Sequence, residues 1–99
     1  MTNFDVCVAF VNGSKNGAHS LSMSISNDGS KLYSYATVIA QKLPNGAIIL
    51  NDTKYSATTS KHQYDARHAI SCYAKTLKTY HTDKLVPRGT YDLTRYYSK

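Results

Sequence analysis

Glutamate is absent from this chain, and its absence narrows the chemistry that the sequence can support. All six acidic residues among the 99 are aspartates. The sequence also lacks a serine-centred nucleophile motif and any set of residues with metal-ligand spacing. These absences argue against an enzyme and against a metal or other cofactor, so we expect a protein without catalytic activity.

Cysteine and long apolar runs are scarce as well. Cys7 and Cys72 each lie in an apolar pattern, which predicts buried free thiols rather than a disulfide and favours a reducing compartment. The longest apolar runs, residues 6–11 and 47–50, are far too short to span a bilayer. No signal-peptide pattern is visible at the N-terminus. We therefore expect a cytoplasmic protein with no membrane partner.

Positive charge is what the chain has in excess. Twelve Lys and Arg residues face six Asp residues, which gives a net charge of +6 and an isoelectric point near 9.4. This balance favours an anionic partner, either nucleic acid or an acidic protein surface. The length predicts a single domain over residues 1–99, with residues 79–99 as a candidate appended tail, and the chain is compatible with a homodimer.

Three segments are predicted to form an antiparallel β-meander. Residues 19–26 alternate between apolar and serine positions, which is typical of a half-buried strand. Turn residues at 27–30 lead into a second strand over 31–43, and a turn at 44–46 leads into a third over 47–52.

The alternation also predicts which side chains share a face of these strands. In the first strand, Leu21, Met23 and Ile25 share one face. In the second strand, one face would hold Leu32, Ser34, Ala36, Val38 and Ala40, and the other Tyr33, Tyr35, Thr37, Ile39 and Gln41. One side of the sheet would then be aliphatic, and the other would carry two tyrosines.

Two further segments have helical features. Residues 4–12 have a strand-like β-branched content, but a cap at Thr2 or Asn3 and Gly13 after the segment favour a short helix. A long amphipathic helix is predicted from about residue 60 to 79, with Ser60 and Gln63 as a capping box. Its apolar stripe would contain Ala66, Ala69, Ile70, Tyr73, Ala74 and Leu77.

The opposite face of that helix is unusually basic. Its predicted members are Lys61, Tyr64, Arg67, His68, Lys75 and Lys78, with Asp65 as the one acid among them. Free N–H groups and hydroxyls at the helix start would form an anion-binding N-terminus from Thr58, Thr59 and Ser60. The alternative is an ordinary helix cap followed by a solvated face.

The C-terminal residues repeat the combination of aromatic and cationic side chains. Tyr91, Tyr96 and Tyr97 alternate with Arg88 and Arg95, a pattern that suits base stacking and phosphate contact. The alternative is a tail that packs its tyrosines on the core, because tyrosine is amphipathic and often half-buried.

Two motifs resemble those of a family of small uncharacterised proteins from bacteriophages and mobile elements. They are LYSYATVIAQ at 32–41 and NDTKYSATTSKHQ at 51–63, within a similarity that covers residues 20–70. The family's aromatic–Val–Asn–Gly segment matches Phe10 to Gly13, which favours the helical reading of residues 4–12. The resemblance implies a phage-like origin and no known activity.

Three functions remain open on this basis. The first is a phage-type accessory protein that binds nucleic acid through the basic helix face and through Tyr33 and Tyr35. The alternative is an inhibitor of a host protein, either a defence protein of the anti-CRISPR or anti-restriction type or a transcription protein. A hydrolase with His62 or His68 as base is disfavoured, since His62 lies at the apolar edge of the helix, where a structural histidine is the commoner case.

Overall fold

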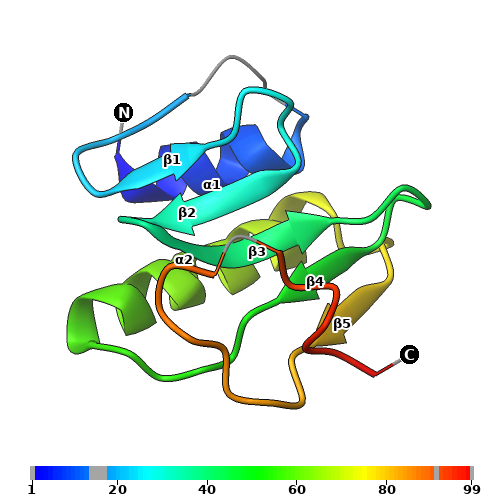
Figure 1. Ribbon diagram of the computed structural model, residues 1–99. Coiled ribbons are helices and arrows are strands. Elements are labelled where there is room, and N and C mark those ends of the chain that lie inside the picture. Colours follow the sequence, from blue (N-terminus) through cyan, green and yellow to red (C-terminus); the bar gives the residue numbers. More distant parts are fainter. Residues whose placement is uncertain (1, 14–17, 91, 99) are drawn as a thin grey trace.

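Two helices and five strands make up the described part of the chain, which covers residues 2–13, 18–90 and 92–98 of a computed structural model (Figure 1). Their order is α1 (Asn3–Val11), β1 (Met23–Ile25), β2 (Lys31–Ser34), β3 (Thr37–Lys42), β4 (Ile48–Leu50), α2 (Ala57–Tyr73) and β5 (Thr79–His81). The predicted α+β class is confirmed. The prediction of a three-stranded meander has too few strands, because the sheet has five strands in the order β1-β2-β3-β4-β5.

The segment with mixed helix and strand features, residues 4–12, lies almost wholly in helix α1. Thr2 caps this helix, because its hydroxyl accepts a hydrogen bond from the Asp5 N–H at 3.1 Å and the Asp5 carboxylate accepts one from the Thr2 N–H at 3.0 Å. Gly13 follows the helix with φ +84°, a conformation that suits glycine at a helix end. The helix buries Val6, Cys7 and Phe10.

The first hairpin forms as predicted, but its first strand is short. Asp28 holds the turn between β1 and β2, because its Oδ1 accepts hydrogen bonds from the hydroxyl groups of Ser26 and Ser30, both at 2.7 Å. Strand β1 begins only at Met23. Leu21 therefore lies outside the strand with its side chain fully exposed, and its predicted place on the buried face is wrong.

The predicted strand over residues 31–43 is in fact two strands. Tyr35 and Ala36 form a tight turn between β2 and β3, and Tyr35 adopts the left-handed region with φ +54°. A bulge follows, because Leu32 pairs with Ala40 whereas Tyr33 pairs with Val38. The extra residue reverses the alternation, so Ile39 joins the core beneath the helices and Val38 joins the core on the opposite face.

Strand β5 was not predicted at all. It follows α2 and pairs in parallel with β4, with Ile48 opposite Thr79 and Leu50 opposite His81. A parallel neighbour requires a crossover connection, and α2 supplies it. Residues 79–81 therefore form the last strand of the sheet, whereas the prediction made residue 79 the end of the helix and residues 79–99 a candidate tail.

Helix α2 starts and stops earlier than predicted. Ala66, Ala69 and Ile70 are buried as the helical stripe predicts, and Ala74 is buried directly after the helix. Tyr73 is 58% exposed, and Leu77 lies beyond the helix end and is 38% exposed, so neither belongs to the buried stripe. Neither helix of the described ranges combines the length and apolarity needed to cross a membrane.

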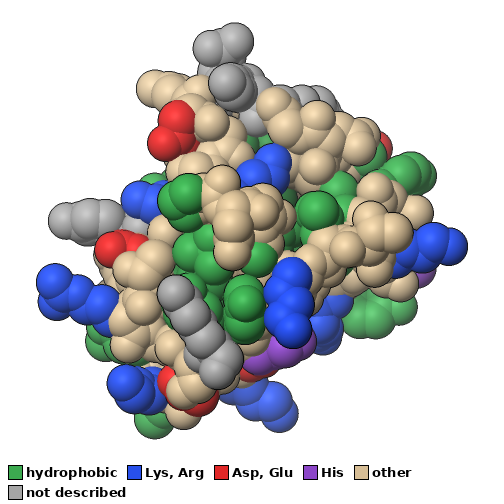
Figure 2. Space-filling model, turned by 90° about the vertical axis from the view of Figure 1, so that its right-hand side faces the viewer, with side chains coloured by type: hydrophobic (Ala, Val, Ile, Leu, Met, Phe, Trp, Pro, Cys, Tyr) green, Lys and Arg blue, Asp and Glu red, His purple; other side chains and the backbone are tan. Residues whose placement is uncertain are grey.

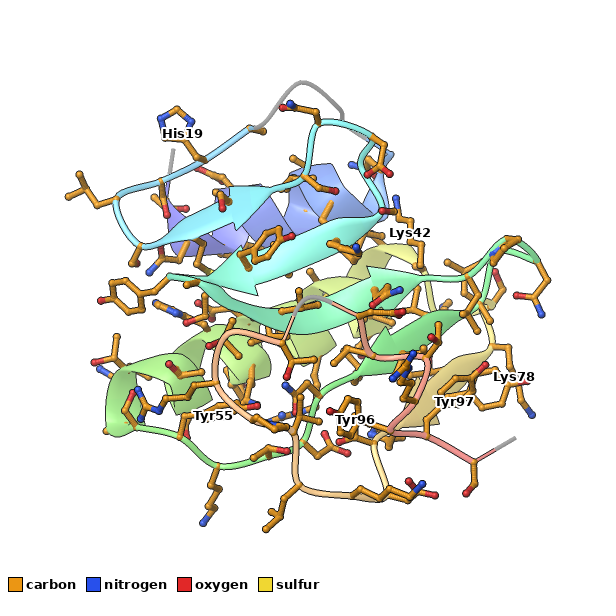
Figure 3. The ribbon with its side chains drawn as sticks, viewed as in Figure 1. His19, Lys42, Tyr55, Lys78, Tyr96 and Tyr97 are labelled. Carbon is orange, nitrogen blue, oxygen red and sulfur yellow. The ribbon has the colours of Figure 1, made fainter. Side chains whose placement is uncertain are left out.

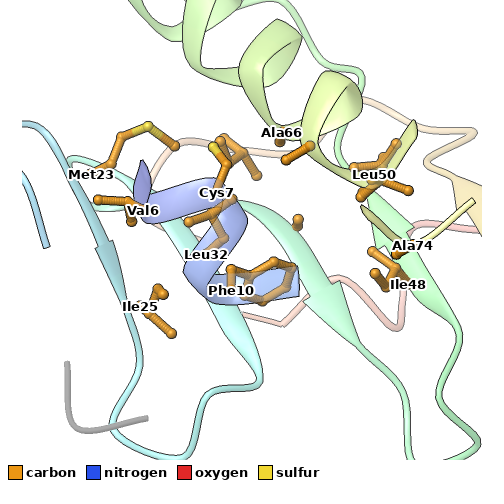
Figure 4. Packing of buried hydrophobic residues seen from close by; sticks show 14 residues of the cluster. Val6, Cys7, Phe10, Met23, Ile25, Leu32, Ile48, Leu50, Ala66 and Ala74 are labelled. Atoms are coloured by element: carbon orange, nitrogen blue, oxygen red, sulfur yellow. The ribbon is translucent and has the colours of Figure 1, made fainter. Parts of the chain in front are cut away.

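Side chains pack on both faces of the sheet. Helices α1 and α2 lie together behind the sheet, and the C-terminal segment, residues 82–90 and 92–98, crosses its front (Figure 1). The larger core lies under the helices and contains Phe10, Leu32 and Ile48 (Figure 4). A smaller core under the C-terminal segment joins Val38, Ile49, Val86 and Leu93.

Candidate functional site

Four of the predicted binding residues lie together on the solvent side of α2. Lys61, Tyr64, Arg67 and His68 are all exposed, and we call this surface the α2 outer face. The rings of Tyr64 and His68 stack with centroids 6.0 Å apart and planes 26° apart. Phe4 of α1 contacts the same imidazole at 5.4 Å between centroids. A row of three aromatic rings therefore runs across the two helices, with cationic side chains beside it.

A shallow hollow lies at the N-terminal end of this face. Its volume is about 550 Å³, and it is lined by Ala57, Ser60, Lys61, Tyr64 and Asp65. The hollow offers one cation, one carboxylate and one aromatic ring to a bound molecule.

The start of α2 differs from the predicted capping box. Ser56 is the N-cap, and its hydroxyl accepts a hydrogen bond from the Thr59 N–H at 3.2 Å. Gln63 is buried and donates to the carbonyl oxygens of Asn51 and Thr53 at 2.6 and 2.9 Å, so it takes no part in a cap at Ser60.

The three residues of the predicted anion-binding N-terminus have different environments. Thr58 is exposed, Ser60 is half-buried, and Thr59 is only 5% exposed. The Thr59 hydroxyl lies 3.2 Å from that of Ser34 inside the fold. Ser56 already binds the N–H of Thr59 through its hydroxyl and the N–H of Ser60 through its carbonyl oxygen.

Lys75 and Lys78 do not share the α2 outer face, because the helix ends at Tyr73. Both side chains are exposed in the connection to β5. The Lys78 Nζ atom lies 5.6 Å from the centre of the Tyr80 ring, which is a cation–π contact. The prediction that these lysines project from one helix together with Lys61 is therefore wrong.

The two strand tyrosines have separate environments. Tyr33 is half-buried and packs against the smaller core. Tyr35 is 62% exposed at the β2–β3 turn, with its ring centroid 5.9 Å from that of His62. Tyr33 and Tyr35 therefore do not form the shared tyrosine face that the alternation predicted.

The C-terminal residues pack largely as the tail alternative describes. Tyr96 and Tyr97 are half-buried against the smaller core, and Tyr91 lies outside the described residues. Arg88 is exposed with its guanidinium carbon 5.6 Å from the centre of the Tyr55 ring. Arg95 is also exposed and lines a hollow of about 330 Å³.

His62 is buried within a network of polar side chains. Its Nδ1 atom lies 2.6 Å from the Ser34 hydroxyl, and its Nε2 atom lies 3.2 Å from both the Asn3 amide nitrogen and the Ser22 hydroxyl. The Asn3 amide nitrogen can only donate, so Nε2 accepts and Nδ1 carries the proton toward Ser34. The imidazole is only 2% exposed, which supports the structural interpretation of this histidine over a catalytic one.

Burial shifts the pKa of two groups near these helices. Desolvation lowers the pKa of His62 below its ordinary value, and the charge of Asp65 opposes this shift. Desolvation, helped by the charge of Asp65, raises the pKa of the Cys7 thiol to about 12, so this thiol is inert at neutral pH. Cys72 is a free thiol too, but it is exposed, and its predicted burial is wrong.

Sequence reasoning missed two features with chemical character. Ser56 was overlooked because Ser60, with Gln63 three residues later, presents the stronger capping pattern. Tyr80 was assigned no role, yet it contacts Tyr97 with ring centroids 5.2 Å apart. Only the contact between β5 and the C-terminal segment reveals this pair, so no local sequence signal could have indicated it.

The chemistry that these surfaces offer is binding through cations and aromatic rings. No group of three or more His, Cys or Asp side chains in the described ranges has a geometry that could hold a metal ion. The α2 outer face presents its cations and rings to solvent rather than within a closed cavity.

Comparison with known proteins gives one match. No curated protein and no solved structure is significantly similar to the chain. Residues 9–83 match the Family of unknown function (DUF8033). This match begins in the last turn of α1, extends through β5 and includes both motifs on which the sequence resemblance was based. The chain therefore belongs to the Family of unknown function (DUF8033).

Proposed function

We propose that this protein binds nucleic acid through the α2 outer face and catalyses no reaction. One observation carries the proposal: Lys61 and Arg67 lie beside the stacked rings of Tyr64 and His68 on a single exposed helix face. Cations next to exposed aromatic rings can contact phosphates and bases together. The net charge of +6 supports an anionic partner of this kind.

Phosphate contact by the α2 outer face predicts how binding depends on nucleic-acid sequence and on salt. Lys61 and Arg67 would contact the sugar–phosphate backbone, which carries no sequence information, so binding is expected to tolerate many sequences. Each phosphate contact releases counterions, and the affinity therefore falls steeply with salt. Exposed cations elsewhere, including Lys75, Arg88 and Arg95, add attraction at longer range.

The test is a binding titration with labelled single-stranded and double-stranded oligonucleotides at two salt concentrations. The double variant Lys61→Ala/Arg67→Ala should bind every sequence more weakly and should lower the salt slope by about one per lost contact. The control Lys54→Ala/Lys84→Ala removes the same charge from exposed positions outside α2 and should bind nearly as the wild type does. If both double variants lose the same amount of nucleic-acid affinity, the loss is due to the lower net charge and not to the α2 outer face.

A second candidate is an inhibitor that docks on a host defence or transcription protein. Tyr64 and Tyr73 of α2 are 59% and 58% exposed, and exposed tyrosines are frequent anchors of protein interfaces. Such an interface should respond less to salt than phosphate binding does. Absence of any oligonucleotide complex at low salt would remove the nucleic-acid proposal and favour this candidate.

A further inference from the structure

A groove at one end of the sheet lies apart from the α2 outer face. It is lined by Leu43, Pro44, Asn45, Tyr80 and Tyr97, and its volume is about 270 Å³. Three separate segments form it: the β3–β4 turn, strand β5 and the C-terminal segment. We call it the sheet-end groove. Its volume is below the range of pockets for drug-sized ligands, so it suits a single flat ring.

The two tyrosines of the sheet-end groove are held in place by the core beneath them. Tyr80 and Tyr97 are half-buried and pack against the smaller core with Leu43. Their rings meet at 50° with centroids 5.2 Å apart, so they form a corner rather than a parallel stack. A base entering the groove would therefore stack on one of the two rings and would not insert between them. Rings already fixed by packing lose little conformational entropy when a ligand binds.

Cations stand next to this groove. Lys78 lies at the same end of the sheet as Tyr97 (Figure 3). It is exposed, and its Nζ atom lies 5.6 Å from the centre of the Tyr80 ring. Lys42 lines an adjoining hollow of about 370 Å³, but its Nζ atom lies 4.8 Å from the centre of the Phe10 ring of α1, so Lys78 is the cation that contacts the groove. Figure 2 shows this end of the molecule, where hydrophobic side chains cross the middle and Lys and Arg side chains, with some Asp side chains among them, lie around them.

We propose that the sheet-end groove is a binding site for one unpaired base of a single-stranded nucleic acid. The base stacks on the Tyr80–Tyr97 corner, and Lys78 contacts the neighbouring phosphate. This inference rests on the proposed function and adds to it a preference for single strands. A base in a duplex is stacked between its neighbours, so its ring face cannot reach a protein tyrosine.

A proline-rich peptide is the other ligand that aromatic grooves commonly bind. Two features favour the nucleic acid. The groove has a lysine next to its aromatic corner, and the whole chain carries a charge of +6, which complements a polyanion. A proline-rich segment needs the aromatic rings but has no phosphate for the lysine.

The first experiment replaces Tyr97. Fluorescein-labelled oligothymidine and a duplex of the same length would be titrated with wild type, Tyr97→Leu and Tyr97→Phe. Leucine keeps the apolar packing but removes the ring, so single-strand affinity should fall roughly 5- to 150-fold, as expected for loss of one stacked base. Duplex affinity should stay at the wild-type value. Tyr97→Phe keeps the ring and should bind the single strand as the wild type does.

The second experiment tests the cation without touching the core. Lys78→Ala should weaken single-strand binding more than Lys75→Ala does, although both remove one exposed charge from the same connection. Because neither lysine is buried, both variants should fold normally, and this pair decides the question if Tyr97→Leu is unstable.

Three outcomes would overturn the inference, and they differ from failure of the proposed function. One is equal weakening of single-strand and duplex binding by Tyr97→Leu, and another is equal effects of the two lysine changes. A third is a proline-rich peptide that loses binding in Tyr97→Leu while oligothymidine does not. In all three, the wild-type protein still binds nucleic acid, so the proposed function of the α2 outer face stands. Absence of binding to either oligonucleotide by the wild type would instead remove both proposals.

Discussion

His62 joins parts of the chain that are far apart in sequence. Its ring contacts Asn3 at the start of α1, Ser22 before β1 and Ser34 at the end of β2. These contacts require a neutral ring, because a protonated imidazole has two donors and no acceptor for the Asn3 amide. Protonation of His62 would therefore remove the acceptor that the Asn3 amide of α1 uses, while the larger core still packs α1 and the first hairpin against α2.

Acid should lower the free energy of unfolding through the protonation of His62. The pKa of His62 lies below its ordinary value of 6.5 in the folded protein, mainly because the ring is buried. The unfolded chain thus takes up a proton at higher pH than the folded one. The contribution of His62 to the free energy of unfolding is therefore complete above about pH 6.5, and it decreases as the pH falls below that value. Urea unfolding between roughly pH 7.5 and pH 5 measures this decrease.

The matched variants are His62→Gln and His68→Gln. His62→Gln should lower the stability at neutral pH but flatten its dependence on pH, and His68→Gln, which removes an exposed imidazole from the same helix, is the control for the substitution itself. Asp65 is the charged group that opposes the His62 shift, and Asp65→Asn should make the decrease steeper. Parallel pH curves for wild type and His62→Gln would contradict this account.

Single residues show where sequence reasoning succeeds and where it ends. The burial of His62 could be predicted from its place at the apolar edge of a helical pattern, because that pattern determines which side chains point toward the core. The turn at Tyr35 could not be found in the same way. Tyrosine is a strand-forming residue that rarely adopts φ +54°, so only the pairing of β2 with β3 forces it into a turn.

At the scale of elements, the start of α2 gives a sharp test. Ser56→Ala removes the hydroxyl that accepts from the Thr59 N–H, so the free energy of unfolding should fall by about 0.5–2 kcal/mol. Ser60→Ala should cost less, because its side chain does not cap the helix. Urea unfolding of the two variants compares them directly, and a larger loss for Ser60→Ala would place the helix start four residues later.

The ends of elements were the least predictable part of the fold. The phase of α2 followed from its apolar period, and this placed Lys61, Tyr64, Arg67 and His68 on the exposed face. The end of α2 could not be predicted in this way, because residues 74–86 contain no glycine or proline that would mark it. Strand β5 has only three residues, and its formation depends on a partner that lies before the helix.

At the scale of the whole molecule, the C-terminal segment acts as a second cover for the sheet. Leu93 is fully buried against Val38 and Ile49, and the Leu93 N–H donates to the Gln41 side chain at 2.7 Å. The Tyr55 hydroxyl donates to the carbonyl oxygen of Val86 at 2.5 Å. The segment is thus attached through both packing and hydrogen bonds.

Truncating its anchor should therefore destabilise the entire domain. Leu93→Ala should lower the free energy of unfolding by about 2–5 kcal/mol, because it leaves a cavity in the smaller core. Leu85→Ala makes the same chemical change in the same segment, but its side chain is 83% exposed, so it should change stability by no more than about 0.5 kcal/mol. Chemical denaturation measures both, and similar losses would mean that the segment is not a structural layer.

The parallel pairing of β4 with β5 has a consequence for how the protein is made. A ribosome delivers the first four strands in the order in which they pair, so that part of the sheet can assemble as it emerges. The next neighbour of β4 arrives only after the whole of α2 has been synthesised, and closing that long loop is entropically slow. Until then the edge of β4 is unprotected, and the nascent chain is most exposed to aggregation at that moment.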